Sequence, residues 1–481
     1  MREISFVDTT LRDAHQCLWN GQMTTAMMLP IAPVIDEVGF EALDFMALIS
    51  MDWCVRHQRE NPWERLRLMA AAMPNTPLIV GGVLRNFGNV PDSVTAFWIQ
   101  TIAAAGARRI RINDPYHDVD QIAKAINWSK AAGMTTMAAL IYSYSPVHTD
   151  AYYADKARAI AAAGADRIFI KDVDGLLTPE RTRTLVPAIM KEIDGLPLEL
   201  HGHCTTGLAP LYYLEAMKLG IQTVHTAVSP LANGASQPAA ENMLHNARVL
   251  GFATALNETA LTAMAAHFRF VAKREGFPIG VPVEYDLLQY EHQVPGGMMS
   301  NYKAELARRG LAHRLPDLLR EIAQIRKELG YPIMVTPISQ YIGAQAILNQ
   351  TAGERYQIVT DEIIKYVLGH YGELAAPVDQ EVLAHLMRLP RTRELQHWEL
   401  PQRGLDELRQ EYGADLSDED FLLRVLSSNQ DAVDEVLAAG PARYTYPRGD
   451  KPVLALVCDL IQRRDVASVH IQKGDFSLTL R

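Results

Sequence analysis

The segment Arg167-Ile-Phe-Ile-Lys171-Asp-Val-Asp-Gly-Leu-Leu177 ends a short apolar run with a lysine, and thirty residues later a second apolar run ends in His201-Gly-His203. In a strand, side chains at i and i+2 point to the same side, so the two histidines can face one cation together. Asp13 also follows an apolar run. A lysine ammonium cannot bind a cation, whereas a lysine carbamate can, through its anionic oxygens. These side chains indicate an enzyme that handles carbon dioxide units at a divalent metal.

Short apolar runs alternate with longer amphipathic stretches over the first 250 residues, a pattern typical of a parallel sheet wrapped by helices. We expect strands at Ile4–Asp8, Ala42–Ala47, Leu78–Leu84, Arg109–Asn113, Thr135–Tyr142, Arg167–Lys171, Leu198–His203 and Thr223–Val228. Eight such units predict an α/β fold, the (β/α)₈ or TIM barrel, whose chemistry lies at the carboxyl ends of its strands. A doubly wound sheet would predict a glycine-rich phosphate turn after the first strand, and the sequence has none there.

Beyond the barrel the sequence pattern changes three times. We expect the barrel domain at residues 1–285, and helical patterns with Pro-Gly-Gly and Gly-Tyr-Pro breaks predict a mostly helical second domain at 286–385. A charged stretch at 386–440 predicts a helical appendage. In the tail, residues 441–481, a helical pattern precedes an alternation broken at Lys473-Gly-Asp475, which predicts a helix followed by a β-hairpin.

Length and composition are typical of a soluble enzyme. The 481 residues, 48% of them apolar, suffice for a large barrel plus a second domain. A net charge of −10 without a basic block argues against nucleic acid as a partner. The amino terminus has no signal-peptide core, and no run of about 18 apolar residues predicts a membrane span. Four cysteines without metal or disulfide spacing fit a reducing compartment, so we expect a cytoplasmic protein.

Several motifs stand out together: Asp8-Thr-Thr-Leu-Arg-Asp-Ala-His-Gln16, Val83-Leu-Arg-Asn86, Ile170-Lys-Asp172, His201-Gly-His203 and Asn233-Gly-Ala-Ser-Gln-Pro238. This combination resembles the carboxyltransferase domain of pyruvate carboxylase, and with it the α subunit of oxaloacetate decarboxylase and the 5S subunit of transcarboxylase. The resemblance continues through what is called the conserved carboxylase domain of that family, at Pro295-Gly-Gly-Met, Val335-Thr-Pro-Ile-Ser-Gln340 and Gly353-Glu-Arg-Tyr356. It covers about residues 3 to 385.

The resemblance implies a metal site. Asp13, His201, His203 and a carboxylated Lys171 would hold one divalent metal, typically zinc, manganese or cobalt, and Lys171 would carry carbon dioxide as a carbamate. The physical chemistry agrees, because a metal polarises a carbonyl as a Lewis acid and stabilises an enolate.

The resemblance also implies a substrate side formed by Arg12, Gln16 and Arg85, with Arg12 and Gln16 taking part in catalysis beside Lys171. Arg85 would pair with a substrate carboxylate, since a guanidinium fork holds a carboxylate through two parallel hydrogen bonds.

Three positions depart from the family pattern. Ala235 stands where the family has a threonine that relays a proton, so we assign that catalytic role to the nearby hydroxyl of Ser236. Met46-Ala-Leu-Ile-Ser50 replaces a Trp-Gly-Gly-Ala-Thr sequence, which reshapes the pocket floor. Asp92 stands where a tyrosine is expected.

By resemblance, the chain is a biotin-dependent carboxyltransferase that moves carbon dioxide between carboxybiotin and a 2-oxo acid of the pyruvate or oxaloacetate type, or a small ketone, through a metal-stabilised enolate. A separate biotin carboxyl carrier protein would deliver the biotin, and a biotin carboxylase subunit or a membrane decarboxylase subunit would complete the assembly. We also expect a homo-oligomer. Glu215-Ala-Met-Lys-Leu219 imitates a biotinylation site, but its helical pattern argues against that use.

Other interpretations remain open. Lys171 could form a Schiff base, as in aldolases of the same barrel fold, and the histidine pair could be structural. A biotin-independent metal lyase of the hydroxymethylglutaryl-CoA lyase type has a similar metal pattern but lacks the second domain. A non-catalytic scaffold subunit is the third alternative, and the intact ligand set argues against it.

The tail at 441–481 resembles the leader that precedes the biotinyl domain in carrier proteins. It is either a solvent-exposed appendage or a docking element for a partner subunit, because a strand with free edges is suited to pairing with another sheet.

Overall fold

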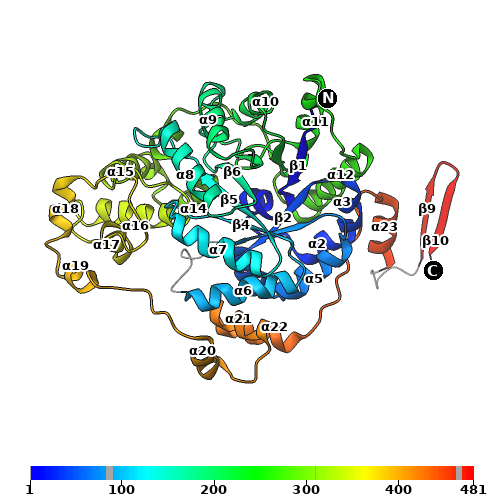
Figure 1. Cartoon of the computed structure of the whole chain (residues 1–481). Helices are drawn as coiled ribbons and strands as arrows, with labels where there is room; N and C mark the ends of the chain where they lie inside the picture. Colours follow the sequence, from blue (N-terminus) through cyan, green and yellow to red (C-terminus); the bar gives the residue numbers. More distant parts are fainter. Residues whose placement is uncertain (1, 83–89, 309, 462–467, 481) are drawn as a thin grey trace.

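The computed structural model describes residues 2–82, 90–308, 310–461 and 468–480. Eight parallel strands close into a barrel in sequence order (Figure 1). They are β1 Ser5–Asp8, β2 Ala42–Ala47, β3 Leu78–Gly82, β4 Arg109–Ile112, β5 Thr135–Ile141, β6 Arg167–Asp172, β7 Leu198–Gly202 and β8 Thr223–Thr226. The predicted fold class is therefore confirmed. The predicted strand ends agree to within two residues, except that residues 83 and 84 of the third strand lie outside the described residues.

An outer layer of helices covers the barrel. After β1, the chain passes through η1 (Thr10–Ala14), α1 (His15–Trp19), α2 (Thr25–Met28) and η2 (Leu29–Ile31) before the first outer helix. The outer helices are α3 Ala32–Val38, α5 Pro62–Ala72, α6 Asp92–Ala104, α7 Val119–Ala131, α8 Asp150–Ala162, α9 Pro179–Glu192, α10 Ala209–Leu219 and α11 Ala240–Val249, joined by α12 Glu258–Glu275. Side-chain caps set several of their starts; Asp118, for example, accepts from two backbone N–H groups of α7.

A second helical region follows the barrel and has an apolar core of its own. It contains α13 Leu288–His292, α14 Gly296–Arg308, α15 Leu315–Glu328, α16 Ile338–Thr351, α17 Asp361–Val367, α18 Gln380–Leu386 and α19 Pro390–Leu395. Leu318, Ile322, Ile342 and Leu386 are buried in this core, which is separate from the barrel's main core. In Figure 1 these helices lie to one side of the barrel.

Three later helices return to the barrel. They are α20 Leu405–Tyr412, α21 Asp418–Leu426 and α22 Gln430–Ala439, drawn in orange below α5 and α6 in Figure 1. Their buried residues Phe421, Leu422, Val433 and Val436 belong to the main barrel core. The predicted stretch 386–440 is thus helical, and its second half packs on the barrel; the domain boundaries themselves stay predictions.

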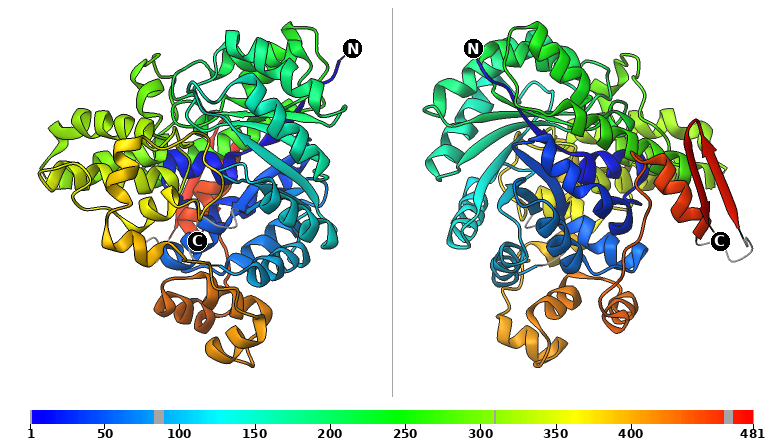
Figure 2. Two further views of the ribbon diagram at one scale, coloured as in Figure 1. Left: turned by 60° about the vertical axis from the view of Figure 1, so that its left-hand side comes forward. Right: turned by 90° about the vertical axis from the view of Figure 1, so that its right-hand side faces the viewer.

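The tail forms the predicted helix and hairpin: α23 Pro452–Ile461, then β9 Val469–Lys473 paired antiparallel with β10 Phe476–Leu480. Figure 2 shows the hairpin projecting from the body of the molecule. Residues before α23 do touch the barrel, since Tyr446 donates to Glu275 and the Gly449 N–H to His267 Nδ1. No helix among the described residues combines the length and apolarity that crossing a membrane requires.

Candidate metal centre

Asp13 is placed by a π-helical turn directly after the first strand. β1 ends at Asp8, and the Asp8 carboxylate accepts from both the backbone N–H and the hydroxyl of Thr10, at 3.1 and 2.6 Å. This contact fixes the start of η1, on which Asp13 is 5% exposed. Helical segments of this wide type are frequent at functional sites.

The His-Gly-His motif comes from the carboxyl end of β7, and its glycine is required by close packing. A Cβ at Gly202 would overlap the Tyr212 hydroxyl of α10, which donates to Asp172 at 3.0 Å. The Gly202 N–H also donates to the Tyr213 hydroxyl at 2.7 Å. The backbone between the two histidines is therefore held against α10.

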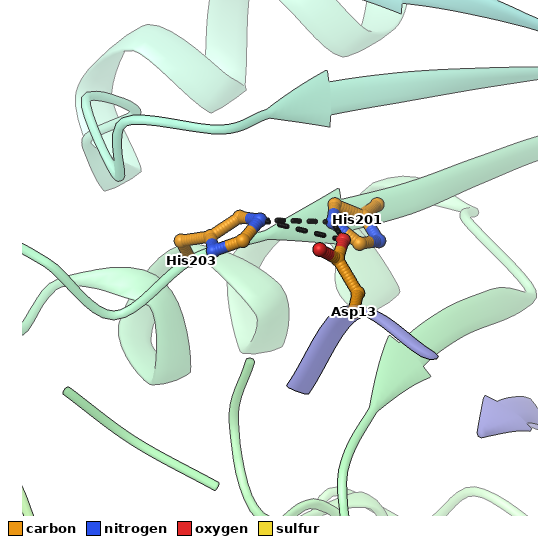
Figure 3. Close-up of side chains that lie close together, drawn as sticks. All are labelled: Asp13, His201 and His203. Carbon is orange, nitrogen blue, oxygen red and sulfur yellow. Dashed lines mark hydrogen bonds and ion pairs between the residues drawn. The ribbon is translucent and has the colours of Figure 1, made fainter. Parts of the chain in front are cut away.

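Asp13, His201 and His203 converge on one point (Figure 3). The two Nε2 atoms are 3.2 Å apart, and Asp13 Oδ2 lies 3.1 Å from His201 Nε2 and 3.6 Å from His203 Nε2. Ligand atoms of a tetrahedral site with bonds of about 2.0–2.1 Å are about 3.3 Å apart. Asp13 Oδ2 is buried and has no hydrogen-bond partner of acceptable geometry. The three groups therefore fit a divalent metal.

The protonation of the three groups differs. His203 Nδ1 lies 2.7 Å from the Ala235 carbonyl oxygen, which can only accept, so Nδ1 carries a proton and Nε2 is the nitrogen that can bind a cation. Burial opposes the charged form of His203, but Cys17 and Asp13 raise its pKa well above the ordinary value, so a cation at Nε2 would displace a proton. Burial lowers the pKa of His201 well below its ordinary value and keeps the imidazole neutral. Burial opposes ionisation of Asp13 as well, but the Arg12 guanidinium and the two histidines hold its pKa well below the ordinary range.

Lys171 lies on the strand next to His201 and is paired with it in register, Lys171 on β6 with His201 on β7. Its side chain is 5% exposed and lines the same pocket as Asp13 and His203. Burial, and secondarily the Arg111 guanidinium, lower the pKa of Lys171 to about 7. A large fraction of the Lys171 amine is therefore neutral near neutral pH. The neutral amine is the form that can add carbon dioxide.

The pocket has a volume of about 400 Å³ and lies between the barrel mouth and the second helical region. Arg12, Gln16 and Arg111 line its barrel side. Arg12 Nε and the Nε and Nη2 of Arg111 are buried without hydrogen-bond partners, as is Gln16 Oε1. Asp44 engages only one edge of Arg111. Buried guanidinium N–H groups without partners favour an anionic ligand such as a carboxylate.

The helical region supplies the opposite wall of this pocket. Its contribution comes from Pro295, Gly296, Gly297, Met298, Asn301, Val335, Thr336 and Gln340. The motifs Pro295-Gly-Gly-Met and Val335–Gln340, which carried part of the resemblance, thus lie at the site.

Two predicted site residues are not placed in the pocket. Arg85 lies outside the described residues, so its substrate contact stays a prediction. Ser236 is fully buried and is not among the residues that line the pocket; its hydroxyl donates to Gln237 Oε1 at 3.2 Å, and its catalytic role also stays a prediction. Ala235 places its carbonyl on His203 and its Cβ beside Gly296.

Two further side chains at the site, Gln237 and Arg111, were not among the site residues predicted from the sequence. Gln237 Nε2 lies 3.1 Å from His203 Nε2 and 3.4 Å from His201 Nε2, so this amide faces the metal ligands. Arg111 projects from β4 into the pocket, and a Cβ on Gly81 of β3 would collide with its guanidinium. A signal existed for Arg111, because charged residues alternate with isoleucines in Arg109-Ile-Arg-Ile112.

A closed parallel barrel with a carboxylate and two histidines at the ends of its strands, beside buried arginines, is typical of enzymes that bind a divalent metal. Comparison with known proteins makes the family specific. A family model described as HMGL-like matches residues 3–267, more than half of the chain, and one described as the conserved carboxylase domain matches residues 290–432.

Curated relatives match the barrel and the helical region together. The B subunit of pyruvate carboxylase from Methanothermobacter thermautotrophicus is 33% identical over 94% of this chain and 82% of its own length. Its counterpart in Methanocaldococcus jannaschii is 38% identical over 80% of this chain and 68% of its own length. The methylmalonyl-CoA carboxyltransferase 5S subunit of Propionibacterium freudenreichii is 31% identical over 79% of this chain and 75% of its own.

Solved structures agree on the fold. The carboxyl transferase domain of Rhizobium etli pyruvate carboxylase, solved with pyruvate, superimposes with a TM-score of 0.83 at 21% identity and covers 100% of this chain and 83% of that chain. The chain belongs to the family of biotin-dependent carboxyltransferases that contains the pyruvate carboxylase B subunits and the transcarboxylase 5S subunit.

Proposed function

We propose that this chain transfers a carboxyl group between carboxybiotin, carried on a separate biotin carboxyl carrier protein, and a 2-oxo acid of the pyruvate or oxaloacetate type. A biotin carboxylase subunit or a membrane decarboxylase subunit would complete the assembly, and the chain would form a homo-oligomer. The observation that carries the substrate proposal is the pocket itself, in which the Asp13–His201–His203 cluster faces two buried arginines with unpartnered N–H groups.

Asp13, His201, His203 and a carbamate on Lys171 would hold a zinc, manganese or cobalt ion, which would supply Lewis acidity toward the substrate's carbonyl oxygen. The carbamate fits this place, because Lys171 is buried, lines the pocket and is paired in register with His201. The negative charge of the carbamate would offset the positive charge of the neighbouring arginines, Arg12 and Arg111.

Arg12 and Arg111 would bind the substrate carboxylate, with Arg85 as a further proposed contact. Both arginines keep one edge engaged by acidic side chains, Arg12 by Asp13 at 3.0 Å and Arg111 by Asp44, and present the other N–H groups to the pocket. This anchoring fixes the direction of the free N–H groups before the substrate arrives. Gln16 would orient the substrate from α1, since its Oε1 has no partner of its own.

The proton removed from the 2-oxo acid needs an acceptor. Ala235 offers none, and the Ser236 hydroxyl is engaged with Gln237. Ser236 would therefore act only by exchanging that bond for one toward the pocket.

The biotin-independent lyase alternative receives less support, because part of the pocket wall comes from residues 295–301 and 335–340, within the match to the conserved carboxylase domain. A scaffold without catalysis fits poorly with the three converging ligand atoms of Asp13, His201 and His203.

The test combines metal analysis with turnover. Purified protein should contain about one divalent ion per chain, and Lys171 should carry the added mass of one carboxyl group. His203→Ala should remove most of the metal and the exchange of carboxyl groups between a carboxylated biotin carrier and a 2-oxo acid, whereas His245→Ala, an exposed histidine on α11, should change neither. Full turnover by metal-free protein would overturn the proposal.

A second measurement tests the substrate class. Arg111→Lys and Arg85→Lys should each lower kcat/KM for the 2-oxo acid by about 10–100-fold, because a point charge cannot replace a guanidinium fork. Unchanged turnover in both variants would favour a neutral ketone as the substrate.

A further inference from the structure

A chain of buried polar side chains continues inward from the metal ligands. His201 turns Nε2 toward Asp13 and His203, and its other ring nitrogen, Nδ1, lies 3.2 Å from His225 Nδ1. The opposite nitrogen of that ring, His225 Nε2, lies 2.9 Å from Glu199 Oε2. The three residues are 0–2% exposed.

The strand register places these side chains in a column. Glu199 and His201 are two residues apart on β7, so their side chains point to the same side of the sheet. Glu199 is paired in register with Thr223 of β8, which lies two residues before His225. The rings of His201 and His225 meet edge to face, with centroids 5.3 Å apart and planes at 89°. Phe169 of β6 stacks on the His225 ring at 5.6 Å and 16°, which fixes the plane of that ring.

Arginines secure the far end of the column. Glu199 Oε1 accepts from Arg167 Nη1 at 2.9 Å and lies 3.6 Å from Arg109 Nη1. A carboxylate paired with two guanidinium groups accepts hydrogen bonds and does not donate them. A neutral His225 must therefore donate from Nε2, and its Nδ1 carries the lone pair.

The hydrogen-bond directions then follow along the whole column. Because His225 Nδ1 can only accept, His201 must donate from Nδ1, and the lone pair of His201 is left on Nε2. That nitrogen is the one that faces Asp13 and His203. With the opposite directions, His201 Nε2 would carry a proton and could not bind a cation.

We propose that Glu199 and His225 are positioning residues for the metal centre, which set the tautomer and ring orientation of His201 so that its Nε2 lone pair faces the cluster. Neither residue touches the pocket; both act through His201. The inference rests on the metal site of the proposed function, and it adds two residues that no motif or spacing in the sequence singles out.

The test measures divalent-metal affinity of the full-length apo-protein, with Co²⁺ as the probe, by calorimetry and by the visible absorption of the bound ion. His225→Phe keeps the stacked ring and removes the acceptor, so the Kd should rise about 10–100-fold and the Co²⁺ spectrum should change. His225→Asn can again accept from His201 Nδ1, and its Kd should return to within about threefold of the original.

Two controls keep the result interpretable. His267→Phe removes a buried imidazole on α12 that bonds the Met27 carbonyl oxygen and the Gly449 N–H, and it should leave the Co²⁺ affinity unchanged. Glu199→Gln retains the shape and removes the charge, so it replaces His225→Phe if that variant fails to fold, with an expected rise in Kd of at least about threefold.

His201→Ala separates the two hypotheses. If the original protein binds no Co²⁺, or if His201→Ala binds it equally well, the metal site itself is wrong. If His201→Ala loses the ion while folded His225→Phe and Glu199→Gln bind it with the original affinity and spectrum, the metal site stands and the positioning inference is overturned.

Discussion

The two helical regions that follow the barrel differ in what they do for it. Helices α13–α19 bury their apolar side chains in a core of their own and lend residues to the pocket wall. Helices α20–α22 place Phe421 and Val433 in the barrel core, and the described pocket lining contains none of their residues. The first region therefore shapes the site, whereas the second stabilises the barrel.

Phe421→Ala should have the largest effect on stability. Phe421 is fully buried in the barrel core, so truncation should lower the free energy of unfolding by about 3–5 kcal/mol. Metal content and KM at a temperature well below the transition should stay unchanged. Denaturant unfolding followed by circular dichroism measures the loss. A loss below about 1 kcal/mol would mean that α21 only rests on the barrel surface.

Glu328→Gln should destabilise the second region in a pH-dependent way. Glu328 accepts from Arg355 at 2.6 and 2.8 Å and from the Tyr356 hydroxyl at 2.7 Å, which joins α15 to the segment after α16. Its replacement should cost about 2 kcal/mol near pH 7.

The sign of the pH dependence follows from the Glu328 carboxyl. Burial opposes its ionisation, but the bonds from Arg355, Gln324 and Tyr356 lower the pKa below its ordinary value of 4.5. The stabilisation is therefore present above pH 4.5 and is lost as the pH falls through the lowered pKa. The difference in Tm between the original protein and the variant should shrink below that pH; a difference that stays constant down to about pH 3 would contradict this account.

Asn301→Ala should alter binding rather than stability. Asn301 is exposed on α14 and lines the pocket, so its loss should raise KM for the 2-oxo acid about 3–10-fold while the free energy of unfolding changes by less than about 0.5 kcal/mol. Lys303→Ala, an exposed position on the same helix outside the pocket lining, is the matched control. Equal KM values in both variants would remove the second region from the substrate site.

Truncation after Ile461 should have the smallest effect on the barrel. It removes the projecting hairpin and keeps the contacts of Tyr446 and Gly449, so Tm and metal content should stay the same. We expect weaker association with the carrier or carboxylase subunit, because the hairpin offers free strand edges. A pull-down with that partner measures it, and equal recovery of both forms would show that the hairpin is not the docking element.

The sequence predicted the barrel well because parallel strands are short apolar runs with polar residues at their ends. Lys171, His201 and His203 lie at such ends, and spacing by two puts the histidines on one side. Asp13 was found in the same way, although the π-helical turn that aims it was not predictable from periodicity.

What the sequence could not predict depends on packing between distant segments. The amphipathic pattern of α21 shows that Phe421 is buried but not which surface receives it. His225 and Glu199 sit inside ordinary-looking strands, and only the pairing of β7 with β8 brings their side chains together. Gln237 was part of a recognised motif, yet its approach to His201 and His203 depends on the loop conformation after β8.

The split origin of the pocket wall has a consequence for synthesis of the chain. The ribosome completes Asp13, Lys171 and the histidine pair by residue 203, whereas Asn301 and Gln340, on the opposite wall, emerge roughly 100 and 140 residues later. At about 5–20 residues per second, the ligand set precedes its cover by about 5–30 seconds. During that interval the proposed metal ligands exist without the helical region that covers them, and Phe421, which is buried in the barrel core, has yet to be made.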